Sequence, residues 1–140
     1  MFPLTTQEVE AAVQQYWSAC AAKDAEQQQA FYNRCAMVFT SSSKRIERGC
    51  IVSMQRQRQY LAKSTKLRIR VADVEVLPLG DNAAVALYTL QLHAQHIPME
   101  GTVNQLREEH LAGARVTHVF ERDGSGKLKI VHEHISMPQT

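Results

Sequence analysis

Hydrophobic and polar side chains alternate with a period of two over residues 115–122 and 128–136, on either side of a glycine-rich connection. This period, the β-branched residues within it and the connection Asp123-Gly124-Ser125-Gly126 predict a β-hairpin. Neither face of the two strands is wholly polar. We therefore expect one face to meet a helix and a cavity, and the other face to meet a second sheet or a partner subunit.

The first third of the chain follows a helical period instead. Thr5 and Glu8 can cap a helix, and apolar residues then recur every three or four positions as far as Ala21. This pattern predicts a helix of about five turns. Lys23-Asp24 interrupts the pattern, and a shorter helix is predicted over residues 25–33.

The middle of the chain is predicted to contain strands and one more helix. The predicted elements are short strands at 36–42 and 45–48, a third helix at 50–64, and long strands at 67–79 and 83–93. Gly80-Asp81-Asn82 forms the turn between the two long strands, because these residue types tolerate positive φ.

Two details of this region affect the predicted sheet. In the strand over 67–79, strict alternation places one set of residues on a common face: Ile69, Val71, Asp73, Glu75 and Leu77. Residues 96–113 contain Pro98 and Gly101 and follow no clear period. We expect this segment to be an excursion at the end of the sheet, as a lid or a subunit contact.

Three helices followed by four long strands predict a single α+β domain over residues 1–140. The simplest packing wraps a curved antiparallel sheet around the long N-terminal helix, with two further helices beside it. Such a shape leaves a cavity between the sheet and the helices, and cavities of this kind bind small molecules.

Composition narrows the class of protein. A hydrophobic share of 44% and a net charge of +2 are ordinary for a globular domain, and the basic residues are too spread out to predict nucleic-acid binding. No signal peptide or membrane-spanning run is present, so a cytoplasmic protein is expected. Cys20, Cys35 and Cys50 are odd in number and lack CxxC spacing, which predicts reduced and mostly buried thiols.

Several motifs resemble the NTF2-like superfamily, which includes ketosteroid isomerases, SnoaL-like polyketide cyclases and the association domain of calmodulin-dependent kinases. RVTHVFERDGSGKLKIVHEHIS is similar to the closing hairpin of SnoaL-like and kinase-association domains, where Gly-(Trp/Leu)-x-Ile-Val-His-x-His-x-Ser recurs; Leu128 stands at the usual Trp place. Glu47-Arg48-Gly49 and Gly80-Asp81-Asn82-Ala83-Ala84-Val85 match two other parts of the family pattern. The resemblance implies a cystatin-like cone, but activities in this superfamily differ widely.

The N-terminal third is also similar to a ketosteroid isomerase. Tyr16 lies where that family has its oxyanion tyrosine, and Tyr32 lies where it has a supporting tyrosine. The carboxylate general base of that family falls on Thr40, a third network tyrosine falls near Gln57, and the protonated acid falls at or beside His118. Because Thr40 cannot accept a proton at neutral pH, classical steroid isomerisation is not expected.

The resemblance implies that three residues of the last strand face the cavity: Val131, Glu133 and Ile135. The opposite strand contributes either His118 and Phe120 or Thr117 and Val119, because a two-residue and a three-residue turn present opposite faces. With the two-residue turn, His118 lies directly across from Glu133. A carboxylate beside an imidazole in a dry pocket would form an acid–base pair near neutral pH.

Tyr16 could then donate a hydrogen bond to a substrate oxygen. The structural alternatives are that Glu133 forms a salt bridge with Arg115 or Arg70, that His118 bonds to backbone, and that Tyr16 only packs in the core. The remaining candidate pocket residues are mainly apolar and suit a small apolar or aromatic molecule: Val13, Trp17, Cys20, Tyr32, Phe39, Thr40, Met54, Leu87, Thr89, Thr117, Val131 and Ile135.

No metal or other cofactor is predicted. His132 and His134 project to one face, with His93 and His96 nearby in sequence, but no acidic or cysteine ligand stands at a recognised spacing. In the superfamily, such histidines lie on the outer face of the sheet.

Arginines line the cavity of kinase-association domains, and their positions fall around Thr89, Thr117 and Ile135 here. Since none of these is arginine, a bound carboxylate is not implied.

Three functions follow as hypotheses. The first is a homodimer, paired through the outer face of the sheet, that binds a small apolar or aromatic molecule and neither nucleic acid nor membrane. The second is an isomerase- or cyclase-type enzyme that transfers a proton next to a carbonyl, with Tyr16 as hydrogen-bond donor and His118 and Glu133 as the acid–base pair. The third is a structural oligomerisation module.

Overall fold

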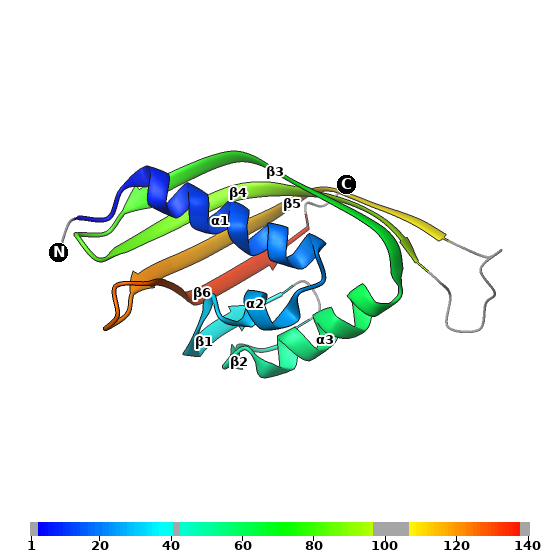
Figure 1. Ribbon diagram of the computed structural model, residues 1–140, viewed down its shortest axis with the longest axis horizontal. Coiled ribbons are helices and arrows are strands. Elements are labelled where there is room, and N and C mark those ends of the chain that lie inside the picture. The colour runs from blue at the N-terminus through cyan, green and yellow to red at the C-terminus, as the bar shows by residue number, and fades with distance from the viewer. Residues whose placement is uncertain (1–2, 41–42, 97–106, 138–140) are drawn as a thin grey trace.

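The computed structural model describes residues 3–40, 43–96 and 107–137, and within these ranges the side chains other than those of residues 60, 61, 96 and 107–112. The predicted α+β fold is confirmed: a curved six-stranded sheet carries the N-terminal helix (Figure 1). The strand order is β2-β1-β6-β5-β4-β3. The elements are α1 (Thr6–Ala21), α2 (Ala25–Gln29), β1 (Tyr32–Phe39), β2 (Glu47–Arg48), α3 (Ile51–Ala62), β3 (Ser64–Pro78), β4 (Ala83–His96), β5 (Arg107–Arg122) and β6 (Leu128–Ser136).

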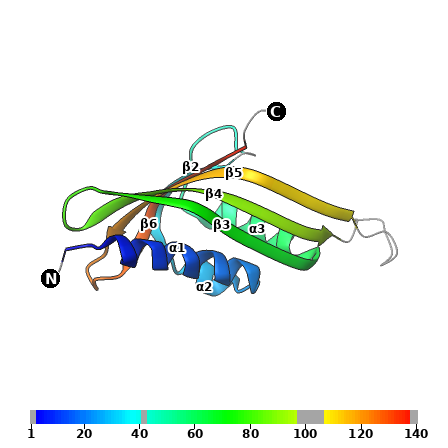
Figure 2. The same cartoon turned by 90° about the horizontal axis from the view of Figure 1, so that it is seen from above.

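Helix α1 begins at the predicted capping box. The Thr5 hydroxyl accepts from the backbone N–H of Glu8 at 3.1 Å, and the Glu8 carboxylate accepts from the Thr5 N–H at 3.3 Å. The apolar stripe of the helix is buried against the sheet, and α1 and α2 lie on the same side of it (Figure 2). Packing of this stripe stabilises α1 far more than its intrinsic helix propensity does.

Strand β1 differs from the prediction in position and in direction. The second helix ends at Gln29 rather than at residue 33, and β1 begins at Tyr32 rather than at residue 36. Tyr32 is a good strand former, and the N–H of Ile130 in β6 donates to the Phe31 carbonyl at 2.7 Å. The pairing of β1 with β6 is parallel, whereas β1–β2, β3–β4, β4–β5 and β5–β6 pair in the antiparallel manner predicted for the sheet.

Strands β4 and β5 extend beyond the predicted ends. β4 continues to His96, and β5 begins at Arg107, so residues 107–113 belong to a strand and not to an excursion. Gly113 has φ +78 beside a register shift between Leu90 and Leu92, a conformation that glycine adopts without strain. Residues 97–106, the rest of the predicted lid or subunit contact, lie outside the described residues.

A bulge in β3 overturns the predicted faces of that strand. Asp73 has φ +57, and the register against β4 shifts between Ala72 and Glu75. Val71 packs against the core before the bulge and Val74 packs against it afterwards, so the inward face moves from odd to even residue numbers. Ile69, Val71, Asp73, Glu75 and Leu77 therefore do not share one face.

A second bulge sets the hairpin of β5 and β6. Its connection is longer than a two-residue turn, because Arg122 pairs with Leu128 and the Asp123 carboxylate accepts from the N–H of Lys127 at 3.0 Å. The pairing then shifts at Val131, the one residue of β6 in this stretch that has no partner in β5. Beyond the shift, His118 lies opposite Glu133. The predicted pair therefore forms, but a bulge and not a two-residue turn produces it.

No helix within the described ranges is long and apolar enough to cross a membrane. The core lies between α1 and the inner face of the sheet, where Phe120 and Ile130 are fully buried beside Val13 and Tyr16. The inner face of β5 thus carries His118 and Phe120, which settles the alternative left open by the turn.

Candidate functional site

A buried carboxylate lies between α1 and the sheet. Glu133 of β6 is only 3% exposed, and three donor groups lie within hydrogen-bond distance of its Oε2. Nε2 of His118 lies at 2.6 Å, the Tyr32 hydroxyl at 2.8 Å and the Tyr16 hydroxyl at 3.4 Å. The hydroxyl oxygens of Tyr16 and Tyr32 are 2.5 Å apart. These donors replace the water that an ionised carboxylate loses on burial.

A chain of side chains orients His118 toward Glu133. The indole N–H of Trp17 donates to the Tyr88 hydroxyl at 2.7 Å, and that hydroxyl lies 3.0 Å from Nδ1 of His118. Every hydrogen finds an acceptor when Tyr88 donates to Nδ1, because Nε2 then carries the imidazole hydrogen and donates it to Glu133. Trp17 on α1 and Tyr88 on β4 thus fix the tautomer of the histidine.

The second carboxylate oxygen of Glu133 is available to a ligand. A cavity of about 200 Å³ is lined by Tyr32, Thr40, Ser53, Arg56, Gln57, Glu133 and Ile135. Within the part of the chain that the structure describes, each hydrogen bond of Glu133 uses Oε2, and Oε1 is not among the fully enclosed polar atoms that lack a partner. We infer that Oε1 faces the cavity. On the rim, Nη1 of Arg56 donates to Glu47 at 3.0 Å.

Burial and the carboxylate charge keep the nearby hydroxyls and thiol protonated. Burial, reinforced by the negative charge of Glu133, raises the pKa values of Tyr16, Tyr32 and Tyr88 well above their usual value. Burial also raises the pKa of the Cys20 thiol to about 12. The three tyrosines therefore serve as hydrogen-bond donors, and Cys20 does not serve as a thiolate nucleophile at neutral pH.

Ten of the fifteen predicted site residues lie on the inner side of the sheet, in two groups. Tyr32, Thr40, Glu133 and Ile135 line the cavity. The others are buried behind it and do not line it: Val13, Tyr16, Trp17, Cys20, Met54 and His118. Tyr16 and His118 therefore contact Glu133, and Tyr32, not Tyr16, presents its side chain to the cavity.

The structural alternatives for Glu133 and His118 do not hold. Glu133 bonds to tyrosine and histidine side chains and not to Arg70 or Arg115. Arg115 lines a groove on the other face of the sheet. His118 bonds to the side chains of Tyr88 and Glu133 rather than to backbone.

Five residues that were predicted to line the cavity do not line it. Ala84, Ala86 and Tyr88 occupy the inner face of β4, so alternation turns Leu87 and Thr89 to the outer face. Thr117 lines the same outer groove. Phe39 and Val131 are not among the residues that line the cavity. The Phe39 ring lies 5.8 Å from that of His134, and Val131 is the bulge residue without a partner in β5.

Sequence reasoning missed four residues of the site. Ser53, Arg56 and Gln57 make the cavity more polar than the mainly apolar cavity that we expected. Their orientation depends on how α3 packs, which the helical period of residues 50–64 left undetermined. Tyr88 had a usable signal: it alternates with Ala84, Ala86 and Leu90 on an apolar face, and a phenol buried there requires a hydrogen-bond partner.

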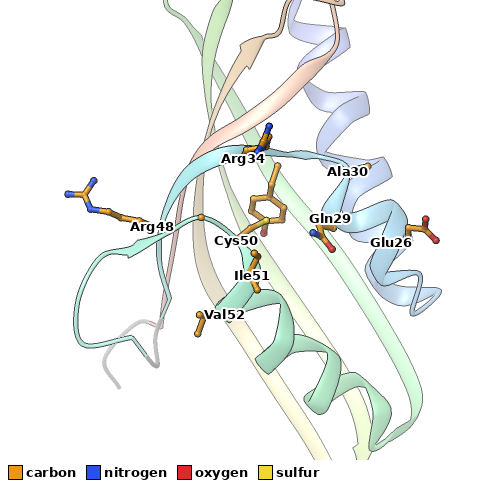
Figure 3. Close-up of a pocket in the computed structure, with 10 residues that line it drawn as sticks. Glu26, Gln29, Ala30, Arg34, Arg48, Cys50, Ile51 and Val52 are labelled. Carbon is orange, nitrogen blue, oxygen red and sulfur yellow. The ribbon is translucent and has the colours of Figure 1, made fainter.

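A larger pocket adjoins the cavity. It has a volume of about 660 Å³ and lies between α2, the first half of β1 and the start of α3. Gln29 and Ala30 face Cys50 and Ile51 across it, while Arg48 extends away from the other labelled side chains (Figure 3). Tyr32 lines both spaces.

Across the residues that the structure describes, no group of three or more His, Cys, Asp or Glu side chains could hold a metal ion. His132 makes a structural contact instead, with Nδ1 2.9 Å from the Met37 carbonyl oxygen. Its ring centroid also lies 6.5 Å from that of Phe39.

Comparison with known proteins identifies relatives by sequence family and by fold. A family model described as a SnoaL-like domain matches residues 9–140. No curated protein matches the chain. A putative dehydratase of the NTF2-like family from Streptomyces avermitilis has a TM-score of 0.78 and 16% identity, with 96% of this chain and 97% of that one covered.

Two further solved structures are similar. An NTF2-like superfamily protein from Salmonella enterica serovar Typhimurium has a TM-score of 0.77 and 21% identity, over 96% of this chain and 91% of that one. A putative calcium/calmodulin-dependent protein kinase II association domain from Xanthomonas campestris has a TM-score of 0.74 and 20% identity, over 98% and 91%. At such identities these structures show the fold alone.

The buried tyrosines predict a loss of stability at high pH. A tyrosine in the unfolded chain ionises near pH 10, whereas Tyr16, Tyr32 and Tyr88 keep their protons in the folded protein, so the unfolded state binds fewer protons above that pH. Each such tyrosine should lower the free energy of unfolding by about 1.4 kcal/mol per pH unit above pH 10. Cys20 should add to this loss from about pH 9.

Urea unfolding of wild type and of Tyr16→Phe at a series of alkaline pH values measures the effect. The variant should lose stability with pH less steeply than wild type, because it has one fewer proton to release on unfolding. Equal slopes would mean that Tyr16 ionises in the folded protein as readily as in the unfolded chain, which contradicts the described environment.

Proposed function

Because the chain belongs to the SnoaL-like domain family, we propose that it binds a small molecule in the cavity beside Glu133. The observation that carries the proposal is the asymmetric bonding of this carboxylate. Its Oε2 lies within hydrogen-bond distance of Tyr16, Tyr32 and His118, while Oε1 has no partner among the described residues and Glu133 lines the cavity. A fixed acceptor at the end of a cavity selects a ligand that brings a hydrogen-bond donor.

The cavity also limits the body of the ligand. Its volume of about 200 Å³ lies below the range of roughly 300–1,000 Å³ typical of drug-sized ligands, which favours a small molecule. Ile135 and the Tyr32 ring supply apolar contact, and Thr40 and Ser53 supply hydroxyls. We propose a small aromatic or otherwise apolar body that carries a hydroxyl or another donor directed to Glu133.

Proton transfer next to a carbonyl is a second candidate function. The hydrogen bonds that connect Trp17, Tyr88, His118 and Glu133 favour this function. Hydrogen bonds in such a chain polarise one another, so they can respond when the charge on Glu133 changes. In this scheme Oε1 of Glu133 accepts the proton and Tyr32 faces the substrate, while Tyr16 and His118 act as positioning residues. Binding remains the first proposal, because it requires only that Oε1 accept a hydrogen bond, whereas catalysis also requires a proton transfer.

The proposal includes a homodimer formed through the outer face of the sheet. A groove of about 560 Å³ on that face brings Asp73 and Glu75 together with Arg115 and His134. In a two-fold pairing, the acidic strand of one copy can meet the basic residues of the other. The exposed Leu87 adds apolar contact on the same face. The three free cysteines are compatible with the predicted cytoplasmic location.

Phenol tests the ligand site, because it combines a small aromatic body with one hydroxyl donor. Wild type should bind phenol more tightly than toluene, and Glu133→Gln should weaken phenol binding by about tenfold or more, since a hydrogen bond to a charged group is lost. Nuclear magnetic resonance titration measures both affinities. Glu10→Gln, which removes an exposed carboxylate of α1 that lines neither the cavity nor the outer groove, serves as the matched control and should bind phenol like wild type.

Equal affinity for phenol and toluene, or unchanged phenol binding by Glu133→Gln, would contradict the proposed role of the carboxylate. The second candidate adds one requirement. The protein would have to catalyse uptake of solvent deuterium at the carbon next to the carbonyl of a small ketone, and Glu133→Gln would have to abolish that uptake.

The dimer predicts a sensitive position on the outer face. Leu87→Glu places a charge where apolar contact is proposed and should convert a micromolar dimer to a monomer in sedimentation velocity. Leu79→Glu is the control, because Leu79 is exposed to a similar extent (51%, against 42% for Leu87) but lies at the β3–β4 turn, away from the proposed contact. This variant should remain a dimer. A wild-type monomer at micromolar concentration, or a Leu87→Glu dimer, would rule out this interface.

A further inference from the structure

An arginine lies at the solvent end of the cavity that Glu133 lines. Both Glu133 and Arg56 of α3 line this cavity of about 200 Å³, but the Glu133 side chain is only 3% exposed, whereas that of Arg56 is 39% exposed. The carboxylate therefore marks the buried end of the cavity, and the guanidinium marks the end near solvent. A ligand that fills this space meets a hydrogen-bond acceptor at its buried end and a hydrogen-bond donor at its solvent end.

Glu47 of β2 holds the guanidinium of Arg56 in place. Nη1 of Arg56 donates to the Glu47 carboxylate at 3.0 Å, and Nη2 donates to the same carboxylate. Such a two-point contact fixes the plane of a guanidinium. Glu47 does not line the cavity, so it contacts the guanidinium from outside it. As far as the described residues show, these bonds use two of the five N–H donors of a guanidinium and leave the others for a ligand.

Tyr32, Ser53 and Gln57, which also line the cavity, are poorer donors to a ligand than Arg56. The Tyr32 hydroxyl already donates to Glu133 at 2.8 Å, and the Ser53 hydroxyl donates to a backbone carbonyl at 3.1 Å. The amide of Gln57 is neutral, and a hydrogen bond from a charged donor is about twice as strong as one between neutral groups. Arg56 therefore supplies the strongest contact to the solvent end of a ligand.

Charge decides which kind of acceptor suits Arg56. His118 is neutral in its Nε2-protonated tautomer, so the carboxylates of Glu133 and Glu47 together with the one guanidinium give this site a net charge of −1. A net negative charge repels a carboxylate or a phosphate group on a ligand. A neutral carbonyl oxygen accepts from the guanidinium without that repulsion.

We propose that the ligand carries a neutral carbonyl opposite its hydroxyl, and that Arg56 is the residue that selects this carbonyl. The hydroxyl donates to Oε1 of Glu133 at the buried end, and the carbonyl accepts from Arg56 at the solvent end. The ligand class is a small hydroxy ketone or hydroxy amide with an aromatic or apolar body. Glu47 is a positioning residue, because it contacts Arg56 and not the ligand. The inference rests on the proposed function, since it names a second recognised group of the same ligand.

The ketone para-hydroxyacetophenone tests this assignment against para-ethylphenol, which has the same hydroxyl and a body of similar size without the carbonyl. Wild type should bind the ketone more tightly, and Arg56→Met should reduce that preference by about tenfold, because a charged donor is lost. The carbonyl also makes the phenol hydroxyl a stronger donor to Glu133, so the decisive quantity is the change in preference between wild type and variant. Nuclear magnetic resonance titration measures the affinities.

Arg58→Met is the matched control. Arg58 is an exposed arginine on the same helix that does not line the cavity, and its Nη2 donates to Gln29 at 3.1 Å. This variant loses the same charge as Arg56→Met and should keep the wild-type preference for the ketone. An unchanged preference in Arg56→Met, or an equal loss in Arg58→Met, overturns the inference.

Two measurements on wild type complete the test. The anion para-hydroxybenzoate should bind more weakly than para-hydroxyacetophenone, and tighter binding of the anion would overturn the assignment of a neutral carbonyl. In ¹⁵N-labelled protein, the side-chain signal of Arg56 should shift more with the ketone than with para-ethylphenol. Equal shifts would contradict the inference even if Arg56→Met does not fold.

The outcomes separate this inference from the proposed function. If Glu133→Gln binds phenol like wild type while the preference for the ketone still depends on Arg56, the role of Glu133 is overturned and that of Arg56 holds. If phenol binding depends on Glu133 but the preference for the ketone does not depend on Arg56, the proposed function holds and the inference is overturned.

Discussion

A carboxylate buried beneath a helix must be surrounded by hydrogen-bond donors, because it gives up the hydration that stabilises its charge. Glu133 meets this requirement with groups from four elements: Tyr16 of α1, Tyr32 of β1, His118 of β5 and, through His118, Tyr88 of β4. The positions of these elements are consequently coupled, since displacing one leaves a charge or a hydroxyl unpaired. The same bonding leaves one oxygen for the cavity, so the constraint on folding and the proposed binding function share one group.

The bulges decide which side chains meet at this group. A strand alternates strictly, so an offset of one residue transfers every later side chain to the other face. The shift at Val131 brings Glu133 opposite His118 and leaves Val131 without a partner in β5. The positive φ of Asp73 does the same in β3 and moves the inward face from Val71 to Val74. The site thus depends on the irregularity at Val131, and the packing of β3 depends on the one at Asp73; a simple period of two contains neither.

The sequence allowed the helix at Thr6–Ala21 and the hairpin to be predicted from strong local periods, and the family resemblance implied Tyr16, Tyr32 and Glu133 as site residues. It left open whether His118 joins them, because a simple period of two does not contain the bulge that brings His118 opposite Glu133. The assignment of Leu87, Thr89 and Thr117 to the cavity was wrong, because apolar residues on both faces of β4 gave no indication of which face was inward. Ser53, Arg56 and Gln57 were missed because the packing angle of a short helix is a tertiary property. Their polarity changes the expected ligand from purely apolar to one with a donor group.

The ionisation state of Glu133 tests the central claim most directly. Difference infrared spectra between wild type and Glu133→Gln at neutral pH isolate the vibrations of this one side chain. The account predicts the paired stretching bands of a carboxylate, because three donors converge on Oε2 and Tyr16, Tyr32 and Tyr88 remain protonated around it. A single carbonyl band of a protonated carboxylic acid at neutral pH would contradict it.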